Sequence, residues 1–584
     1  MEHLSERPRR ITRKELLRLG ALGVLGGILL GCSAPPSRSE TVIAQESHEV
    51  NREINLLEKQ WTYLPGSQRE AAGLRIQAND FAIVEQDGSG GQENPPVNLF
   101  GTRLAVKGGF ALQAQLLRPA SVSASLQFYG EVPLVADDFR LERKSIRVTA
   151  AKDSITVNMW DGSRQEPVDS RTFDFPAQGR LALRMERLKG KLAFTANGQK
   201  LGEMDERGVF SAGQLWFGAN STSGSWFLSE LQAEELAGGE LQFVDTATLK
   251  VERDPQGLQT LARAKRSGFT IGAAMALAPM VSDNDYARAA LAGNFGSITT
   301  ENALKWQFVH PKPDVYDFHE ADALVALAER HAMAVHGHAL IFGEANPRWV
   351  QDLPANKVET TMIDHLRTTA AHFKGRVASW DVINEPLMPY EEAERRGITG
   401  LRNHIWYRAM GESYIVKAMA AMHNTDSDAL LCINEYGLEA DDERWDAFMA
   451  LMKRLKPQLE AAGVPREKVC VGFQGHVYEP ADRIDPEVLQ RHMQALGELG
   501  FKVRVSEMDV YGSSGAGVQA RQYASVFKAC FEESNCVGWT AWILSDKYNY
   551  YKDNNVIKRG VDGLFGTDMH PRTALNSIRE VLEN

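Results

Sequence analysis

The chain has 584 residues, of which 43% are hydrophobic and 24% are charged. This length predicts two or three domains, and the composition is that of ordinary globular proteins. The net charge of −11 argues against nucleic acid as the main partner, whereas a neutral polymer or a small molecule suits it better.

Residues 1–32 have the layout of a signal peptide. The basic stretch RPRRITRKELLRLG precedes the apolar run ALGVLGGILLG, which is too short to span a bilayer as a helix. The run ends at Cys32, where Leu29-Leu30-Gly31-Cys32 resembles a bacterial lipobox, whose cysteine becomes lipidated. Residues 12–18 resemble a twin-arginine export motif with lysine in place of the second arginine, which leaves the Tat and Sec routes both open.

We therefore expect an exported protein, either secreted or anchored to the bacterial cell envelope through a lipid on Cys32. The lipid is the only expected contact with a membrane. Residues 33–50 are polar and are predicted to form a linker.

Residues 51–240 consist of short alternating segments separated by turn signals. In residues 181–198, LALRMERLKGKLAFTANG, apolar and polar side chains alternate twice, with turns expected at KG and NG. The region is predicted to be an all-β sandwich. Residues 181–235 loosely resemble the concanavalin-like lectin and glucanase jelly rolls, which implies a carbohydrate-binding or structural accessory domain. Three tryptophans could stack on sugars, but their strand positions favour the core: Trp160, Trp216 and Trp226.

After a polar junction at residues 241–255, nearly continuous apolar runs alternate with longer helical patterns up to residue 584. A chain of eight such β segments separated by helices predicts a (β/α)₈ TIM barrel over residues 256–584, with strands covered on both faces. The segments are FTIGAAM, GSITTEN, AVHGHAL, SWDVINE, ALLCINE, VCVGFQGH, VRVSEMD and GWTAWIL.

Polar residues cluster at the C-terminal ends of these predicted strands, where TIM barrels carry their active sites. From the second strand to the eighth they are Glu301, Asn302, His338, Asn384, Glu385, Asn434, Gln474, His476, Glu507, Asp509 and Trp542. Glutamates on strands 4 and 7 without an obvious metal cage suggest glycoside hydrolysis. That reaction needs a proton for the leaving oxygen and a carboxylate at the anomeric carbon.

Residues 256–584 resemble the glycoside hydrolase family 10 xylanases. The blocks GFTIGAA, SITTENALKW, GHALIF, WDVINE, GFQGH, VSEMD and AWILSDKYN follow one another in the family's order. The resemblance implies a retaining endo-β-1,4-xylanase that needs no cofactor and cleaves xylan by double displacement. It makes Glu385 the general acid/base and Glu507 the nucleophile.

The resemblance also implies the roles of neighbouring residues. His476 would hydrogen-bond the nucleophile, Asp509 would orient that histidine, and Asn384 would bind the sugar 2-hydroxyl. Glu507 and Asp509 are two apart on a strand and so point the same way. The other positions expected to contact substrate are Glu301, Asn302, Lys305, His338, Gln474, Trp542, Phe342 and Tyr550. Trp306 is interpreted as a packing residue.

The chain departs from the family in the pocket walls. The family usually reads GHTLVWH, whereas this chain has GHALIFG, so that Phe342 replaces a tryptophan and Gly343 a histidine. Tyr550 stands where a tryptophan is usual. Both glutamates remain, so hydrolysis is expected, and the alternative substrate is a related β-1,4-glycan or a decorated xylan.

Two other interpretations remain open at this point. His336 and His338 lie on one face of a strand, as metal ligands do in some barrels, but no lysine or carboxylate set completes a cage, so no metal site is expected. The chain could instead be a non-catalytic surface lipoprotein that binds polysaccharide, although such a protein would have no need for the full catalytic set.

The remaining cysteines carry a separate prediction. Cys530 and Cys536 lie six apart, and in an oxidising compartment they could form a short-loop disulfide or remain two buried thiols. Cys432 and Cys470 lie in apolar strand-like runs and are expected in the core.

Overall fold

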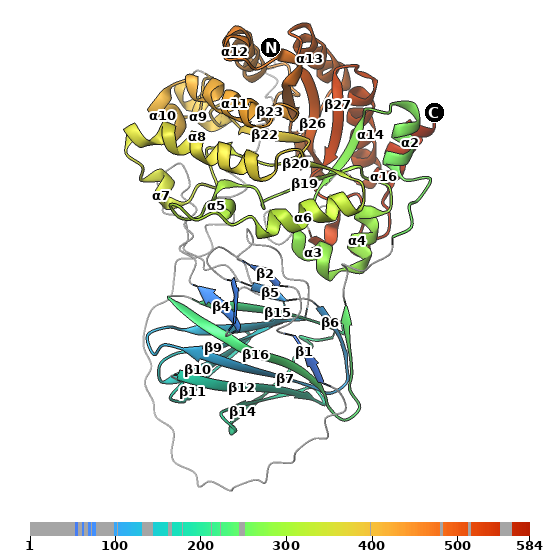
Figure 1. The fold of residues 1–584 in the computed structure, drawn as a ribbon. Helices are drawn as coiled ribbons and strands as arrows, with labels where there is room; N and C mark the ends of the chain where they lie inside the picture. The colour runs from blue at the N-terminus through green and yellow to red at the C-terminus, as the bar shows by residue number, and fades with distance from the viewer. Residues whose placement is uncertain are drawn as a thin grey trace, which may run out of the picture.

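The computed structural model describes two bodies of secondary structure, one all-β and one α/β (Figure 1). The described residues are 53–56, 61–63, 68–71, 73–77, 99–101, 103–130, 144–161, 166–177, 179–211, 213–221, 224–244, 251–397, 399–478, 483–511, 515–548 and 563–584. The predicted signal, Cys32 and the linker lie outside these residues. None of the described helices combines the length and the hydropathy required to cross a membrane.

The N-terminal part consists of two antiparallel sheets. The first runs in the order β14-β13-β12-β7-β16-β4-β3, with β1 paired to β16, and the second in the order β11-β10-β9-β8-β15-β5-β2, with β6 joining β15 to β17. The strands of the first are β1 (Glu53–Asn55), β3 (Gln68–Glu70), β4 (Gly73–Gln77), β7 (Phe110–Arg118), β12 (Gly179–Leu188), β13 (Lys191–Ala196), β14 (Gln199–Asp205) and β16 (Ser225–Glu235). Those of the second are β2 (Trp61–Tyr63), β5 (Leu99–Gly101), β6 (Arg103–Lys107), β8 (Ala124–Tyr129), β9 (Ser145–Ala150), β10 (Ser154–Trp160), β11 (Asp169–Asp174), β15 (Gln214–Ser221) and β17 (Glu240–Val244).

The two turns expected from the sequence join β12 to β13 and β13 to β14. Both residues of each turn have positive φ, namely Lys189 (50°), Gly190 (75°), Asn197 (46°) and Gly198 (80°). That backbone matches the twist of the flanking strands, which is why such pairs close tight hairpins. The predicted meander at residues 181–198 is therefore confirmed.

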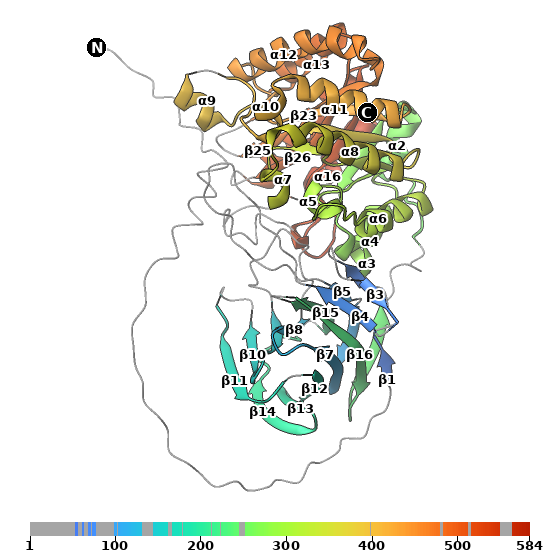
Figure 2. The same cartoon turned by 60° about the vertical axis from the view of Figure 1, so that its left-hand side comes forward.

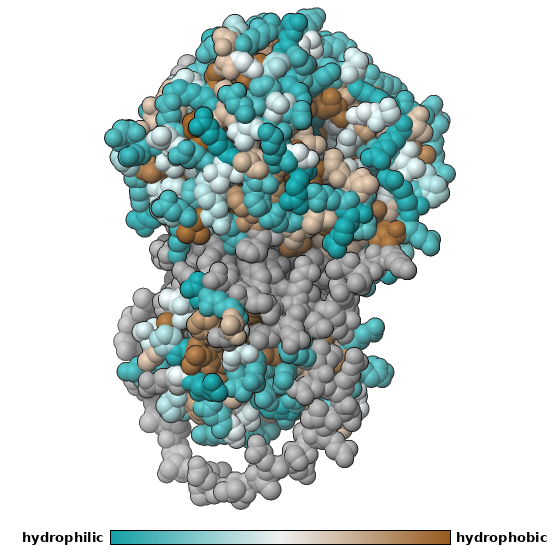
Figure 3. Space-filling model, in the orientation of Figure 1, coloured by the Kyte–Doolittle hydropathy of each residue, from teal (hydrophilic) through white to brown (hydrophobic). Residues whose placement is uncertain are grey.

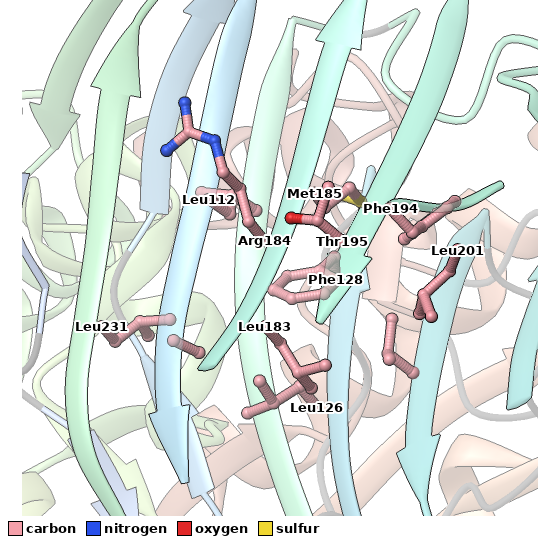
Figure 4. Close-up of a pocket in the computed structure, with 12 residues that line it drawn as sticks. Leu112, Leu126, Phe128, Leu183, Arg184, Met185, Phe194, Thr195, Leu201 and Leu231 are labelled. Carbon is pink, nitrogen blue, oxygen red and sulfur yellow. The ribbon is translucent and has the colours of Figure 1, made fainter. Parts of the chain in front are cut away.

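The sheets pack their alternating apolar faces on each other, which makes a sandwich. Leucines and phenylalanines from β7, β8, β12, β13 and β16 line a small apolar cavity between the sheets (Figure 4). The three tryptophans considered as sugar-stacking candidates are buried, with exposed fractions of 5% for Trp160, 1% for Trp216 and 0% for Trp226. They are core residues, as their strand positions indicated.

The C-terminal part is a closed barrel of parallel strands, which confirms the predicted TIM barrel. Its eight main strands are β18 (Thr270–Ala274), β19 (Ser297–Thr299), β20 (Ala334–Gly337), β22 (Ser379–Asn384), β23 (Leu430–Glu435), β24 (Val469–Phe473), β26 (Lys502–Tyr511) and β27 (Cys536–Ala541). The barrel closes because β18 pairs with both β19 and β27, and β20 pairs with β22. Two short strands that the sequence did not reveal extend the rim, β21 (Ile341–Phe342) and β25 (His476–Tyr478).

Helices surround the barrel in both ribbon views (Figure 1, Figure 2). They are α2 (Leu258–Lys265), α3 (Leu277–Ser282), α4 (Asn284–Leu291), α5 (Trp306–Val309), α6 (His319–Arg330), α7 (Arg348–Gln351), α8 (Ala355–His372), α9 (Tyr390–Arg396), α10 (Ile405–Met410), α11 (Ser413–Thr425), α12 (Glu443–Ala461), α13 (Pro486–Glu498), α14 (Ala516–Glu532) and α16 (Thr573–Glu583), with 3₁₀ turns η1 (Arg466–Lys468) and η2 (Asp546–Tyr548). Their outer faces are mainly hydrophilic, with hydrophobic residues scattered among them (Figure 3). This is the pattern of amphipathic helices that cover a sheet.

The buried hydrophobic residues form two separate clusters. One extends from Leu56 to Leu241 and the other from Leu258 to Leu582. Each part of the chain therefore has its own core, as expected of separate domains.

Candidate active site

The C-terminal ends of the barrel strands carry most of the predicted site residues. Glu385 directly follows β22 and Glu507 lies in β26, with β23 and β24 between these strands. Both residues are almost fully buried, at 3% and 5% exposed. Side chains and backbone groups of the two intervening strands connect them.

Glu507 is held by two side chains. Asn434 Nδ2 donates to Glu507 Oε1 at 2.6 Å, and His476 Nε2 lies 3.2 Å from Oε2. Burial pushes the pKa of Glu507 up, but the nearby His338 and His476 outweigh it and bring this pKa below its ordinary value. Glu507 is therefore ionised at neutral pH, as a carboxylate nucleophile must be.

Asn434 is the residue that links the nucleophile to the predicted sugar-binding amide. The same Nδ2 that donates to Glu507 also donates to Asn384 Oδ1 at 2.9 Å. Ser506 Oγ donates to Asn434 Oδ1 at 2.5 Å and fixes the orientation of this amide. Because Asn434 occupies the oxygen of Asn384, the Nδ2 of Asn384 is the end left to face a substrate hydroxyl. The sequence showed Asn434 at a strand end but gave it no role.

His476 and Asp509 form the predicted pair beside Glu507. His476 Nδ1 lies 2.8 Å from Asp509 Oδ1, and the opposite ring nitrogen faces Glu507. Gly475, with a φ of +77°, separates β24 from β25 and lets His476 pair in register with Asp509. Burial lowers the pKa of His476, but Asp509 and Glu507 outweigh it and raise this pKa to about 10.

Replacing His476 with glutamine is expected to shift the acidic limb of kcat/KM to higher pH by about 1–3 units, the usual effect of one close charge. A protonated His476 lowers the pKa of Glu507, and activity is lost as the pH falls through that pKa. Removing the positive charge raises the pKa of Glu507, so its ionised form is lost sooner on acidification. His570→Gln, at an exposed position, is the control and should leave the limb in place. An unmoved acidic limb in His476→Gln would contradict this role.

Glu385 occupies an unusual backbone position. Its φ is +50°, in the left-handed region, and its amide donates to the Asn434 carbonyl at 2.8 Å. Its carboxyl group accepts from Gln474 Nε2 at 3.3 Å and from Arg402 Nη2 at 3.2 Å. Strained backbone of this kind is often found where a side chain is held for chemistry. Arg402 was missed because it lies in an irregular segment without periodic pattern.

Five of the residues expected to bind sugars follow β19, β20 and β27 at the rim: Glu301, Asn302, Lys305, His338 and Trp542. Lys305 Nζ donates to Asn302 Oδ1. Trp542 makes T-shaped ring contacts with two histidines, with centroids 5.2 Å from His338 and 6.4 Å from His476. Burial raises the pKa of the Tyr286 hydroxyl, and the nearby carboxylate of Glu301 raises it further.

Of the three residues that depart from the family in the pocket wall, Phe342 and Gly343 lie within the described residues. Phe342 is 8% exposed, and its carbonyl accepts from Trp406 Nε1 at 3.1 Å and from Asn346 Nδ2 at 2.8 Å. Tyr550 lies outside the described residues. Trp306 packs against His365, with ring centroids 3.6 Å apart, and is 1% exposed, so its interpretation as a packing residue is confirmed.

Asp381 organises a buried network that the sequence interpretation missed. Its Oδ2 lies 2.9 Å from His336 Nε2 and 2.8 Å from His338 Nδ1. Arg504 Nη1 donates to His336 Nδ1 at 2.8 Å, and Ser379 Oγ lies 2.7 Å from the same nitrogen. The polar signal was present, because Asp381, His336 and Arg504 interrupt strands that are otherwise apolar.

The metal interpretation applies to a group of three residues that lie close enough together to hold an ion: His338, Asp381 and Glu507. One ligand atom from each lies within 4.8 Å of the others. The histidine nitrogens are, however, already directed at Asp381 at hydrogen-bond distances. We expect activity to be unchanged after dialysis against EDTA, measured as reducing-sugar release. A loss that added divalent metal restored would contradict this expectation.

The cysteines of the barrel fall into two groups. Cys530 and Cys536 form a disulfide, with Cα atoms 5.5 Å apart. Cys432 and Cys470 are free and buried. The disulfide joins the end of α14 to the start of β27, whereas Trp542 follows the other end of that strand.

Comparisons with known proteins agree with the barrel. The profile of glycosyl hydrolase family 10 matches residues 258–581. A beta-1,4-xylanase of Dictyoglomus thermophilum is 34% identical over 264 residues, covering 45% of this chain and 69% of that protein. Endo-1,4-beta-xylanase B of Thermotoga neapolitana is 30% identical over 301 residues, covering 50% of this chain and 81% of that protein. The structure of native xylanase 10B from Thermotoga maritima aligns with a TM-score of 0.50 and 29% identity, over 56% of this chain and 98% of that one.

Proposed function

The chain belongs to glycosyl hydrolase family 10, and from this we propose that it is an endo-1,4-β-xylanase that cleaves the xylan backbone with retention of configuration. The observation that carries the proposal is the pair of buried glutamates at the barrel rim, joined through Asn434 and Gln474. A retaining glycosidase needs one carboxylate to attack and one carboxylic acid to protonate the leaving oxygen.

The environment of Glu507 supports the role of nucleophile. Glu507 faces His476, whose pKa of about 10 keeps it protonated, and this favours an ionised nucleophile. Glu385 accepts from Gln474 and from Arg402, and its amide donates to the Asn434 carbonyl. In the first step Glu507 attacks the anomeric carbon while Glu385 protonates the departing oxygen. In the second step Glu385 removes a proton from water, which attacks the same carbon and releases Glu507.

Asn384 is placed to bind the hydroxyl next to the anomeric carbon. Its amide oxygen is occupied by Asn434, so its NH₂ group is the part available to the sugar. Such a contact strengthens as the transition state forms. A second candidate substrate is a related β-1,4-glycan or a decorated xylan, because Phe342 and Gly343 alter the wall beside Asn384.

Reducing-sugar release from a panel of glycans tests the proposal. Xylan, arabinoxylan, glucuronoxylan and mixed-linkage β-glucan would be incubated with the wild type and with Glu507→Ala. Release from xylan by the wild type alone supports a xylanase, and a preference for another member of the panel selects the second candidate. Equal activity of the two proteins, or an inert wild type that still binds the glycans, would contradict hydrolysis and favour a non-catalytic binding protein.

We also propose that the protein is exported and that Cys32 carries a lipid, which rests on the sequence of residues 1–32. Surface attachment would suit a substrate too large to import. In the native host, Cys32→Ala should move the protein from the membrane fraction to the soluble one. Membrane attachment that survived this change would contradict the lipid anchor.

A further inference from the structure

Arg402 divides its guanidinium between two carboxylates. Nη2 donates to Glu385 Oε2 at 3.2 Å, and Nη1 lies 3.5 Å from Glu344 Oε1. The arginine side chain is 3% exposed, the Glu385 side chain 4% and the Glu344 side chain 46%. The acid/base is therefore connected through one buried arginine to a carboxylate at the solvent-facing rim.

The loop that carries Glu344 is fixed in place. Asn346 Nδ2 donates to the carbonyls of Phe342 and Glu344, at 2.8 and 3.1 Å. Ala345 has a φ of +55°, and its carbonyl accepts from the amide of Gln307 at 3.1 Å. Glu344 thus reaches Arg402 from an ordered loop directly after β21.

A general acid beside an arginine meets an electrostatic difficulty. The positive charge of Arg402 favours the ionised form of Glu385, whereas the first catalytic step needs the protonated form. A second anion on the same guanidinium reduces this effect. Glu344 is in position to supply that anion.

The other groups around Arg402 do not replace Glu344. Glu435 of β23 is nearby, but Arg444 Nη2 already donates to Glu435 Oε1 at 2.7 Å. Burial raises the pKa of Tyr436 to about 12, so this side chain is neutral. His404 is also neutral, because burial and then Arg402 lower its pKa to about 3.

Resting on the proposed function, we propose that Glu344 is a positioning residue for the reaction: it shares Arg402 with the acid/base Glu385 and offsets the positive charge that Arg402 places beside that group. Glu344 acts through Arg402 and not on the sugar. Its removal should change the pH profile and leave the plateau rate nearly unaltered.

The test is the pH dependence of kcat/KM for Glu344→Gln and Glu344→Asp, with the β-1,4-glycan that the wild type cleaves best. The alkaline limb reports loss of the protonated general acid. Without the Glu344 anion, less of the positive charge of Arg402 beside Glu385 is compensated. The alkaline limb of Glu344→Gln should therefore move to lower pH by roughly 0.3–0.7 unit. Glu344→Asp keeps the charge and should fall between Glu344→Gln and the wild type.

Asp352→Asn is the matched control, because Asp352 is 69% exposed and pairs with Arg348 on the surface. Its limb should coincide with that of the wild type. The shift in Glu344→Gln should shrink in about 0.5 M salt, since Glu344 is partly exposed to screening ions. An unmoved alkaline limb in folded Glu344→Gln, or a change confined to KM, overturns the proposal. The alkaline limb is measured on whichever glycan is cleaved, so it tests the role of Glu344 independently of the substrate. A wild type that does not cleave xylan would instead contradict the proposed function.

Discussion

Replacing Glu507 with alanine is expected to lower kcat on xylan by at least about 10⁴-fold, the scale seen when a covalent nucleophile is removed. Asn434 and His476 would remain, but no carboxylate would be left to attack the anomeric carbon. The measurement is the initial rate of reducing-sugar release at the wild-type pH optimum. Glu498→Ala, at an exposed position on α13, is the control for the loss of a glutamate and should keep wild-type activity.

Azide can distinguish a missing nucleophile from a damaged site. With an aryl β-xylobioside, azide can enter the space left by the Glu507 carboxylate, form a bond to the anomeric carbon and expel the phenolate. One displacement inverts the configuration, so the expected product is the α-glycosyl azide. A folded Glu507→Ala that retained wild-type turnover without azide would contradict the nucleophile assignment.

The loss of activity on replacing Glu385 with alanine is expected to depend strongly on the leaving group of the substrate. On xylan, whose leaving alcohol needs a proton, kcat should fall about 10²–10⁴-fold, the usual contribution of general acid catalysis. On an aryl xylobioside with an acidic phenol the first step needs no proton, so the glycosyl-enzyme should form and accumulate. The measurement is the loss of kcat/KM on each substrate, which reports the first step, together with the burst of phenol released before steady turnover.

The same variant should be rescued by azide with the opposite stereochemistry. Azide would attack the glycosyl-enzyme from the face that Glu385 vacates, and the product should be the β-glycosyl azide. Equal losses on xylan and on the activated substrate would show that Glu385 is not the acid. The α-azide would show that it is not on the acid/base face.

The barrel could be predicted from the sequence because its strands are continuous apolar runs with polar ends. The run VRVSEMD became β26, and its period of two correctly placed Glu507 and Asp509 on one side. The hairpins at residues 181–198 were predictable for a similarly local reason, since the KG and NG pairs tolerate positive φ. Where one short segment decides the structure, the sequence suffices.

The partners of the catalytic groups could not be predicted in this way. Asn434 donates to both Asn384 and Glu507 across 50 and 73 residues of chain, a contact that exists only once the barrel has closed. Arg402 reaches Glu385 from an irregular segment, whose path no periodicity describes. Asp381 was detectable as a charge within an apolar run, but its histidine partners become its neighbours only in the folded barrel.

Mass spectrometry after incubation with an activated 2-deoxy-2-fluoro-β-xylobioside tests the assignment of the nucleophile most directly. The fluorine slows both steps and the activated leaving group speeds the first, so the glycosyl-enzyme should accumulate. The account predicts that the wild-type protein gains the mass of one fluorinated disaccharide, on the peptide that contains Glu507. Labelling of another residue, or turnover of the glycan without any covalent adduct, would contradict it.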